Sequence, residues 1–110
     1  LYYIHTHLAN IYQKYSSEKA LTEYNKALFA AQRLKDDLCV CSTLLNIGDY
    51  FYQQDKNEHA LKYYLMTEKY SDKLKSKDNT EIIKARINDI KIKMENELFK
   101  QCAEKIKKHV

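Results

Sequence analysis

Two stretches of the chain match each other at a fixed separation. The eight residues 44–51 precede an alanine and a tyrosine, and a weaker copy of them at 8–12 does the same. The recurring residues are Ala20 and Tyr24 after the first copy and Ala60 and Tyr64 after the second, with the same separation in both cases. A period of about 40 residues is typical of a solenoid built from stacked helix pairs. The period therefore predicts an all-α repeat fold, and it favours binding over catalysis.

The composition also favours helices. The chain has 110 residues, enough for one domain, and it holds no proline and a single glycine, Gly48. Sheets need turn residues that adopt a positive or a fixed φ, and the chain has few of them. Phosphate-binding loops of the Walker and dinucleotide types need several glycines, so the sequence excludes them. No apolar run reaches the roughly 20 residues that span a bilayer, so we expect no membrane-spanning helix.

Cysteine usage and charge bear on the compartment and the partners. Cys39, Cys41 and Cys102 form an odd set without a framework spacing, which suits a reducing cytoplasm. The net charge is +4, and the segment 99–110 alone holds four lysines and one glutamate. We interpret this basic tail as a solvated chain end, with contact to an acidic partner or a membrane surface as the alternative.

Helical periodicity fills five segments separated by short polar breaks. The predicted helices run from about 2 to 14, 18 to 35, 38 to 54, 57 to 75 and 80 to 107. In the first segment, Ile4, Leu8, Ile11 and Tyr15 recur at spacings of three and four. Short connections make neighbouring helices antiparallel, so the segments form helical hairpins.

These segments make up a single predicted domain, with one repeat over about 1–36, a second over about 37–76 and a long C-terminal helix over about 80–107. The last helix is long for a globular protein, so a kink or a second helix after Asn96 is the alternative. The expected N-caps are Ser16 or Ser17, Asp36 or Asp37, and Asn57, because their side chains can accept from free amides of a first helical turn.

With these residues in view, the sequence resembles a tetratricopeptide repeat (TPR) protein. Such repeats favour a large residue, leucine, a small residue and an aromatic on their first helix, and alanine, an aromatic and a small residue on their second. The residues of the second repeat that fill this pattern are Leu44, Ile47, Gly48, Phe51, Ala60, Tyr64 and Thr67. Those of the first repeat are His5, Leu8, Ala9, Tyr12, Ala20, Tyr24 and Ala27. The long period is similar to that of the longer repeats of kinesin light chains and of bacterial peptide-pheromone sensors.

The pattern has a packing reason. Small residues at Ala9, Ala20, Gly48 and Ala60 let paired helices approach closely, and the aromatics fill the space beside them. Gly48 costs about 1 kcal/mol of helix propensity relative to alanine, so the close approach must offset this cost.

The resemblance covers two repeats in residues 1–75. Residues 80–95 resemble a degenerate copy of the first helix of a third repeat, with Ile87 and Asn88 at the positions of Ile47 and Gly48. We interpret this segment as a capping helix. Two repeats are few for independent stability. We therefore expect either that the last helix completes the core or that the chain is a fragment of a longer protein with neighbouring repeats.

The resemblance implies a concave groove, lined by the first helix of each repeat, that receives an extended peptide. The candidate groove residues are Tyr3, Thr6, His7, Asn10 and Gln13 in the first repeat, Ser42, Leu45, Asn46, Asp49, Tyr52 and Gln53 in the second, and Ile82, Ala85, Arg86 and Asp89 in the third helical stretch. Amides and tyrosines suit contact with a peptide backbone. A solvated helix face would be polar too, so that alternative stays open.

Three of these residues form a sharper pattern. Asn10, Asn46 and Arg86 match positions of the carboxylate clamp in chaperone-binding TPR domains, but Thr6 and Ile82 replace the lysines of that clamp. Without the lysines, charge-assisted contacts to a carboxylate are largely lost. Asn46 fits better the asparagine ladder of longer repeats, which holds the ligand backbone.

Other chemistries have weaker support. His5 with His7, and Cys39 with Cys41, stand two residues apart, so on a helix their side chains diverge by about 200° and do not converge on one metal ion. A catalytic cysteine would lack an adjacent base. The ten tyrosines could stack on single-stranded nucleic acid, but the charge is too weakly basic for this function. We expect no metal site and no cofactor.

The sequence thus predicts a cytoplasmic, non-enzymatic module that binds a protein or a short peptide, with Asn10, Asn46 and Arg86 as polar anchors. One alternative is the peptide-sensing domain of a bacterial-type cytoplasmic regulator, with an effector domain outside this chain. The other is a homodimer formed by exposed first and last helices. Nucleic-acid and membrane partners are not expected.

Overall fold

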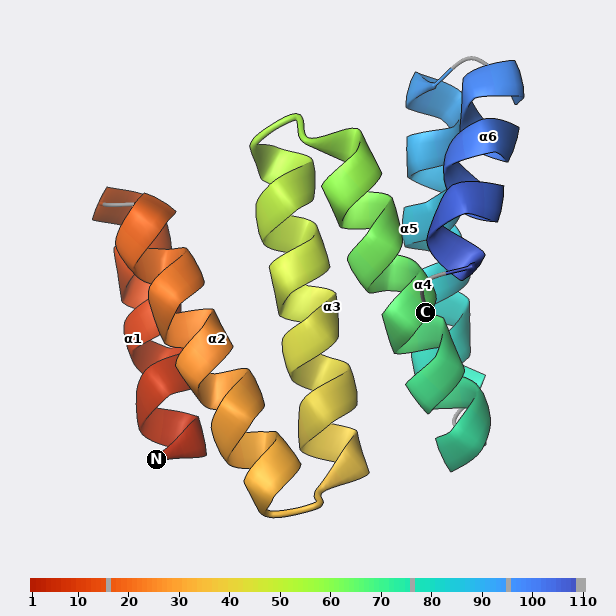
Figure 1. The fold of residues 1–110 in the computed structure, drawn as a ribbon. Helices are drawn as coiled ribbons and strands as arrows, with labels where there is room; N and C mark the ends of the chain where they lie inside the picture. Colours follow the sequence, from red (N-terminus) through yellow and green to blue (C-terminus); the bar gives the residue numbers. More distant parts are fainter. Residues whose placement is uncertain (16, 76, 95, 109–110) are drawn as a thin grey trace.

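The computed structural model describes residues 1–15, 17–75, 77–94 and 96–108, leaving out the side chains of 12–15, 17, 77–79, 96–99 and 102. Regular structure in these ranges is entirely helical, which confirms the predicted all-α class. The helices are α1 (Tyr2–Tyr15), α2 (Ser17–Arg33), α3 (Asp37–Gln53), α4 (Asn57–Leu74), α5 (Lys77–Lys93) and α6 (Asn96–Lys107). The chain reverses direction from each helix to the next (Figure 1).

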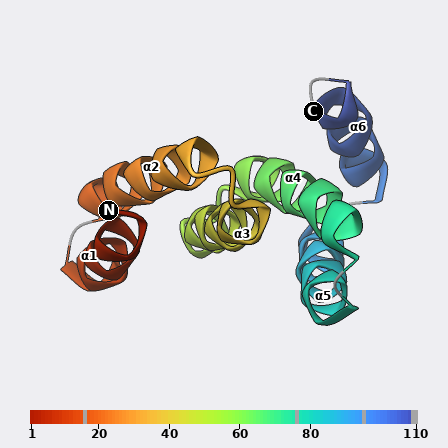
Figure 2. The same cartoon turned by 90° about the horizontal axis from the view of Figure 1, so that it is seen from below.

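Helices that follow each other in the chain pack together, up to α5. The contacts run from α1 to α2, α3, α4 and α5 in turn, whereas α6 packs on α4. Seen along the helices, α1, α3 and α5 form one curved row, and α2, α4 and α6 lie on the opposite side (Figure 2). We call the side formed by α1, α3 and α5 the odd-helix face.

The last part of the chain differs from the prediction. One continuous helix over 80–107 is wrong, because α5 ends at Lys93 and α6 begins at Asn96, which is the position of the alternative second helix. The helix starts explain this break, since α2, α4 and α6 begin at Ser17, Asn57 and Asn96, at nearly equal intervals. The third helix pair therefore keeps the spacing of the first two.

Two helix starts test the predicted N-caps. Asp36 caps α3 as expected, since its side chain accepts a hydrogen bond from the Cys39 amide at 3.2 Å. Asn57 does not cap α4, because it is already the first residue of that helix and Lys56 occupies the cap position without a side-chain bond. Within the described part of the chain, the buried Asn57 Oδ1 has no hydrogen-bond partner. Ser16 and the side chain of Ser17 lie outside the described residues.

Three helices are followed by a non-glycine residue with a positive φ. Lys35, Asp55 and Lys75 follow the ends of α2, α3 and α4 and adopt φ values of 54°, 57° and 54°. Glycine usually takes this left-handed position after a helix, because a side chain there costs about 1–2 kcal/mol. The chain thus turns sharply without glycine, at a cost that helix packing must offset.

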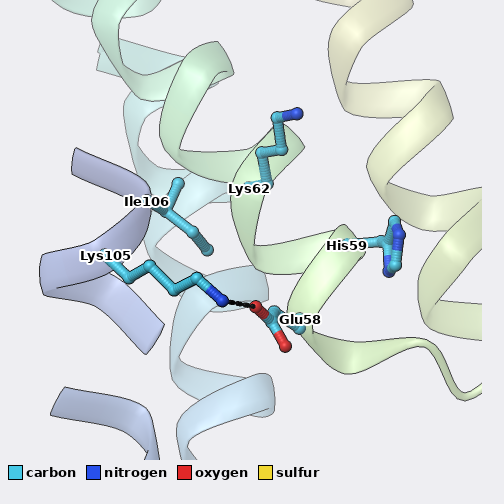
Figure 3. A pocket seen from close by; sticks show the side chains of 5 residues that line it. All are labelled: Glu58, His59, Lys62, Lys105 and Ile106. Carbon is cyan, nitrogen blue, oxygen red and sulfur yellow. Dashed lines mark ion pairs between the residues drawn. The ribbon is translucent and has the colours of Figure 1, made fainter. Parts of the chain in front are cut away.

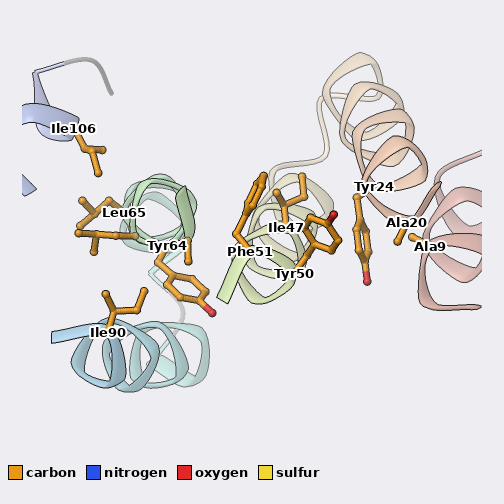
Figure 4. Packing of buried hydrophobic residues seen from close by; sticks show 12 residues of the cluster. Ala9, Ala20, Tyr24, Ile47, Tyr50, Phe51, Tyr64, Leu65, Ile90 and Ile106 are labelled. Atoms are coloured by element: carbon orange, nitrogen blue, oxygen red, sulfur yellow. The ribbon is translucent and has the colours of Figure 1, made fainter. Parts of the chain in front are cut away.

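Small residues line the helix contacts, as the sequence predicts. Ala9, Ala20, Ala27 and Ala60 are fully buried, and one continuous apolar cluster runs from Ala9 in α1 to Ile106 in α6 (Figure 4). A Cβ atom added to Gly48 would lie 2.6 Å from Cε1 of Tyr64, so glycine is needed for this approach of α3 and α4.

The apolar stripe of α1 is not part of this core. Ile4 and Ile11, which define the predicted helical spacing, are 60% and 42% exposed, and Leu8 is half-buried. Among the described side chains of α1, the buried ones are those of Tyr2 and Ala9. The spacing thus predicted the helix correctly, although the stripe faces outward.

Candidate functional site

The candidate groove residues lie on the three helices of the odd-helix face. Two of them meet across helices: Nε of Arg86 in α5 donates a hydrogen bond to Oδ1 of Asp49 in α3 at 2.9 Å. The same carboxylate oxygen accepts from the Tyr64 hydroxyl of α4 at 2.5 Å. Asp49 therefore joins α3, α4 and α5 at one point.

Burial and charge act together at this junction. Tyr64 is fully buried, and burial, followed by the hydrogen bond to Asp49, raises the pKa of its hydroxyl above the ordinary value of 10.0. The bond to Asp49 also raises the pKa of Arg86. The Asp49 and Arg86 side chains are 29% and 40% exposed, so the ion pair is reachable from solvent. The junction thus fixes a charged group at the surface.

The first hairpin repeats half of this arrangement. The Tyr24 hydroxyl donates to Oδ1 of Asn10 at 3.0 Å, as the Tyr64 hydroxyl does to Asp49. Burial and then the negative charge of Asp49 raise the pKa of Tyr24. The sequence separation of Asn10 and Asp49 nearly equals that of Tyr24 and Tyr64, so the two hairpins share one register. Asn10 is thereby tied to its own hairpin.

A second link between α3 and α5 lies further along the helices. The Lys93 ammonium stands 4.1 Å from the centre of the Tyr52 ring, which is a cation–π distance. The same ammonium is 4.0 Å from Oδ1 of Asp55. Tyr52 is half-buried, so this predicted groove residue presents one ring face to Lys93.

Part of the α1 surface forms a shallow depression. Its lining combines four predicted groove residues with two apolar ones: Tyr3, Thr6, His7, Asn10, Ile4 and Leu8. Tyr3 is 78% exposed, and the Thr6 hydroxyl donates to the carbonyl of Tyr2 within its own helix. The structure thus gathers the α1 candidates at the exposed edge of the molecule.

The other candidates are dispersed. Ser42, Gln53, Ala85 and Asp89 are exposed, Ile82 is 42% exposed, Leu45 and Asn46 are half-buried, and the Gln13 side chain lies outside the described residues. Among the described residues, the Asn46 amide makes no hydrogen bond. Of the three predicted anchors, Arg86 is thus hydrogen-bonded to Asp49 and Asn10 to Tyr24. Asn46 has no hydrogen-bond partner among the described residues.

Sequence reasoning missed the polar role of the tyrosines. It placed Tyr24 and Tyr64 in the core, which is confirmed, but their hydroxyls also bind polar residues of the neighbouring helix. A signal was present, since polar residues at 10 and 49 precede the two tyrosines by nearly equal distances. No comparable signal points to Lys93.

A further surface depression lies between α4 and α6 (Figure 3). It is lined by Glu58, His59, Lys62, Lys105 and Ile106. Lys105 Nζ and Glu58 Oε1 are 3.8 Å apart at its rim, and the His59 ring lies toward α3, 5.2 Å from the centre of the Phe51 ring. These contacts join α4 to α6 and to α3.

The two described thiols, those of Cys39 and Cys41, are poorly suited to act as nucleophiles. Burial, and then the hydrogen bond from its thiol to Asp36, raises the pKa of Cys39. Burial likewise raises the pKa of Cys41, whose thiol faces the carbonyl of Thr67 at 3.8 Å. Both thiols therefore stay protonated near neutral pH, and the thiolate is the nucleophilic form.

Among residues 1–15, 17–75, 77–94 and 96–108, no group of three or more histidine, cysteine, aspartate or glutamate side chains is placed to hold a metal ion. No helix in these ranges has the length and apolar character needed to cross a membrane. In comparisons with known proteins, no family model, curated protein or solved structure matches the chain.

Proposed function

We propose that this chain is a non-enzymatic binding domain of the TPR type, and that its odd-helix face receives an extended peptide or protein segment. Three observations support the repeat assignment: the recurring helix starts, the shared register of the two tyrosine bonds, and the close approach at Gly48. The curved row of α1, α3 and α5 supports binding along that face (Figure 2).

One observation carries the binding proposal. Arg86 uses its Nε to bind Asp49, and among the described residues its two terminal nitrogens make no hydrogen bond. A guanidinium held in one orientation loses less entropy on binding a ligand than a free side chain does. Arg86 is therefore a fixed donor pair that can bind a carbonyl or a carboxylate.

Asn46 supplies the matching group on the neighbouring helix. It lies one repeat period before Arg86, so the two residues occupy equivalent positions on α3 and α5. His7 of α1 holds the same position one repeat earlier and is exposed. An amide can donate to a peptide carbonyl and accept from a peptide amide. An extended backbone across these three positions would meet an imidazole, an amide and a guanidinium in turn.

The test is a selection from a phage-displayed library of random dodecapeptides on the immobilised chain. We expect binders whose affinity falls about tenfold in Asn46→Ala, the effect of one lost hydrogen bond of about 1–2 kcal/mol. The variant should keep the parent's unfolding midpoint, because Asn46 makes no bond to a described residue.

Asn25→Ala is the matched control, since Asn25 is an exposed asparagine of α2, outside the odd-helix face. Peptides that bind Asn46→Ala and the parent equally, or a selection that yields no binders, would contradict the proposal.

A further inference from the structure

The last helix, α6, does not form a hairpin with the helix that precedes it. In the first two hairpins the second helix packs on the first, whereas α6 packs on α4 rather than on α5. Figure 2 shows α5 and α6 on opposite sides of α4. The packing that holds α6 in place thus comes from α4.

The sequence of α5 explains why no third hairpin forms. In the second hairpin, Gly48 and Phe51 of α3 lie against tyrosine rings of α4. One repeat period later, α5 has Asn88 and Lys91 at these positions, and both are exposed. Polar side chains there would lose their hydration under a second helix without gaining a close apolar contact. The side of α5 that would face a hairpin partner is therefore unsuited to α6.

Two contacts fix α6 on α4. Ile106 is buried in the apolar cluster, where it points toward Leu65 (Figure 4). Nζ of Lys105 lies 3.8 Å from Oε1 of Glu58, at the rim of the depression between the two helices (Figure 3). Both contacts depend on the sequences of α4 and α6 alone. An α6 from a second copy of the chain would make them equally well.

The link between α5 and α6 contains no helix breaker. Helix α5 ends at Lys93 and α6 begins at Asn96, and residues 77–107 include neither glycine nor proline. Apolar residues continue at helical spacing across the link, at Ile87, Ile90, Met94 and Leu98. The same residues can therefore form one straight helix over 77–107.

A straight helix has an energetic and a geometric consequence. Each helix end leaves four backbone groups without a helical partner, and joining α5 to α6 removes one end of each kind. Because α6 runs opposite to α5, straightening carries α6 away from its own α4 (Figure 1). A second copy, related by a two-fold axis perpendicular to α5, then presents its α4 to this α6 in the present relative direction.

We propose that the surface of α4 that includes Glu58 and Leu65 binds α6 of a second copy of this chain, when α5 and α6 form one straight helix. Each copy gives its α6 to the other and receives the other's in return, so the packing of Ile106 and the ion pair of Lys105 are kept. Such an exchange is a low-cost route to a symmetric dimer, because the contacts already exist within one chain. The dimer carries two odd-helix faces.

The first measurement is analytical ultracentrifugation of the 110-residue chain over a range of concentrations. We expect half of the chains to be dimeric at or below about 1 mM, because a short link holds α6 near its own α4 at an effective concentration of that order. Asn96→Ala should strengthen the dimer roughly tenfold, since alanine favours a helix through the link in both copies. Asn88→Ala, the same substitution at an exposed position of α5 outside the link, should leave the dimer unchanged.

A second measurement tests the exchange itself. Deuterated chains with protonated isoleucine methyls are mixed with deuterated chains that have protonated leucine methyls, and the mixture is unfolded in urea and refolded. We expect a nuclear Overhauser effect between the methyls of Ile106 and Leu65 in the dimer, because these methyls can meet only between copies in this sample. Glu95→Pro should remove both the dimer and this effect, since proline interrupts the straight helix.

Three results would overturn the proposal. The first is a parent chain that stays monomeric up to about 1 mM. The second is a dimer that Glu95→Pro leaves unchanged. The third is a dimer without the effect between Ile106 and Leu65, which would indicate association through another surface.

Discussion

The two hairpins, α1–α2 and α3–α4, share a register but place different types of side chain at equivalent positions between their helices. In the first hairpin, Nδ1 of His5 and the carboxylate of the largely buried Glu23 form a hydrogen-bonded pair at 2.5 Å. In the second, Leu44 and Tyr63 occupy the equivalent positions, and Leu44 is buried in an apolar cluster against which Tyr63 packs.

This difference separates what the repeat requires from what it tolerates. Both hairpins keep small residues and a tyrosine at the closest contact, whereas the position beside it accepts either a polar pair or an apolar pair. Close packing is therefore the constant of the repeat, because a buried polar pair costs little once it is hydrogen-bonded.

The largest effect should come from breaking the closest contact of the second hairpin. Gly48→Val should lower the free energy of unfolding by about 3 kcal/mol, because the new side chain would overlap the buried ring of Tyr64. In the first hairpin, Ala9→Gly should cost only about 1 kcal/mol, through helix propensity. Urea denaturation measures both. A neutral or stabilising Gly48→Val would mean that Tyr64 does not lie against α3.

The tyrosine hydroxyls sharpen the comparison further. Tyr64→Phe removes a bond to a carboxylate and should cost about 2 kcal/mol, whereas Tyr24→Phe removes a bond to a neutral amide and should cost about 1 kcal/mol. Each variant keeps its aromatic ring, so the difference between the two losses of unfolding free energy reflects the chemistry of the hydrogen-bond acceptor. Equal losses in urea denaturation would argue against Asp49 as the acceptor of the Tyr64 bond.

The smallest effect is a pH dependence confined to the first hairpin. The hydrogen bond from His5 lowers the pKa of Glu23 below its ordinary value of 4.5. Because the folded-state pKa is the lower one, the pair stabilises the fold above about pH 4.5, and this contribution is lost as the pH falls through the folded-state pKa.

Glu23→Gln is the variant that isolates this contribution. It should be less stable than the parent at about pH 6, and the gap should close at about pH 3 or below, where the Glu23 carboxyl is protonated and both side chains at this position are neutral. Thermal unfolding at several pH values measures the gap. A gap that stays constant over this range would show that Glu23 acts by packing alone.

Much of the fold could be predicted from the sequence, since the repeat period and the helical spacing are local signals. Helices α1 to α4 lie within about two residues of their predicted bounds. The break before Asn96 was harder to place, because no proline or glycine marks it. The outward stripe of α1 was also hidden, since periodicity identifies an apolar side of a helix but not the neighbour that covers it.

The candidate site was predictable in outline only. Sequence position assigned Asn10, Asn46 and Arg86 to one predicted binding face, and the structure places their helices α1, α3 and α5 in one curved row (Figure 2). Which of them is free depends on partners that come from other helices, such as Tyr24 for Asn10 and Asp49 for Arg86. Such pairings are set by tertiary packing, and one sequence carries little information about them.

The central claim is that equivalent positions of one repeat are covered on α3 and α5 and uncovered on α1. Isoleucine-methyl NMR with a soluble paramagnetic agent measures this directly, because broadening follows solvent exposure. We predict strong broadening of Ile4 and Ile11, comparable to that of Ile92, and little broadening of Ile47, Ile83 and Ile90. Ile4 and Ile11 methyls as protected as those of Ile83 and Ile90 would contradict the account.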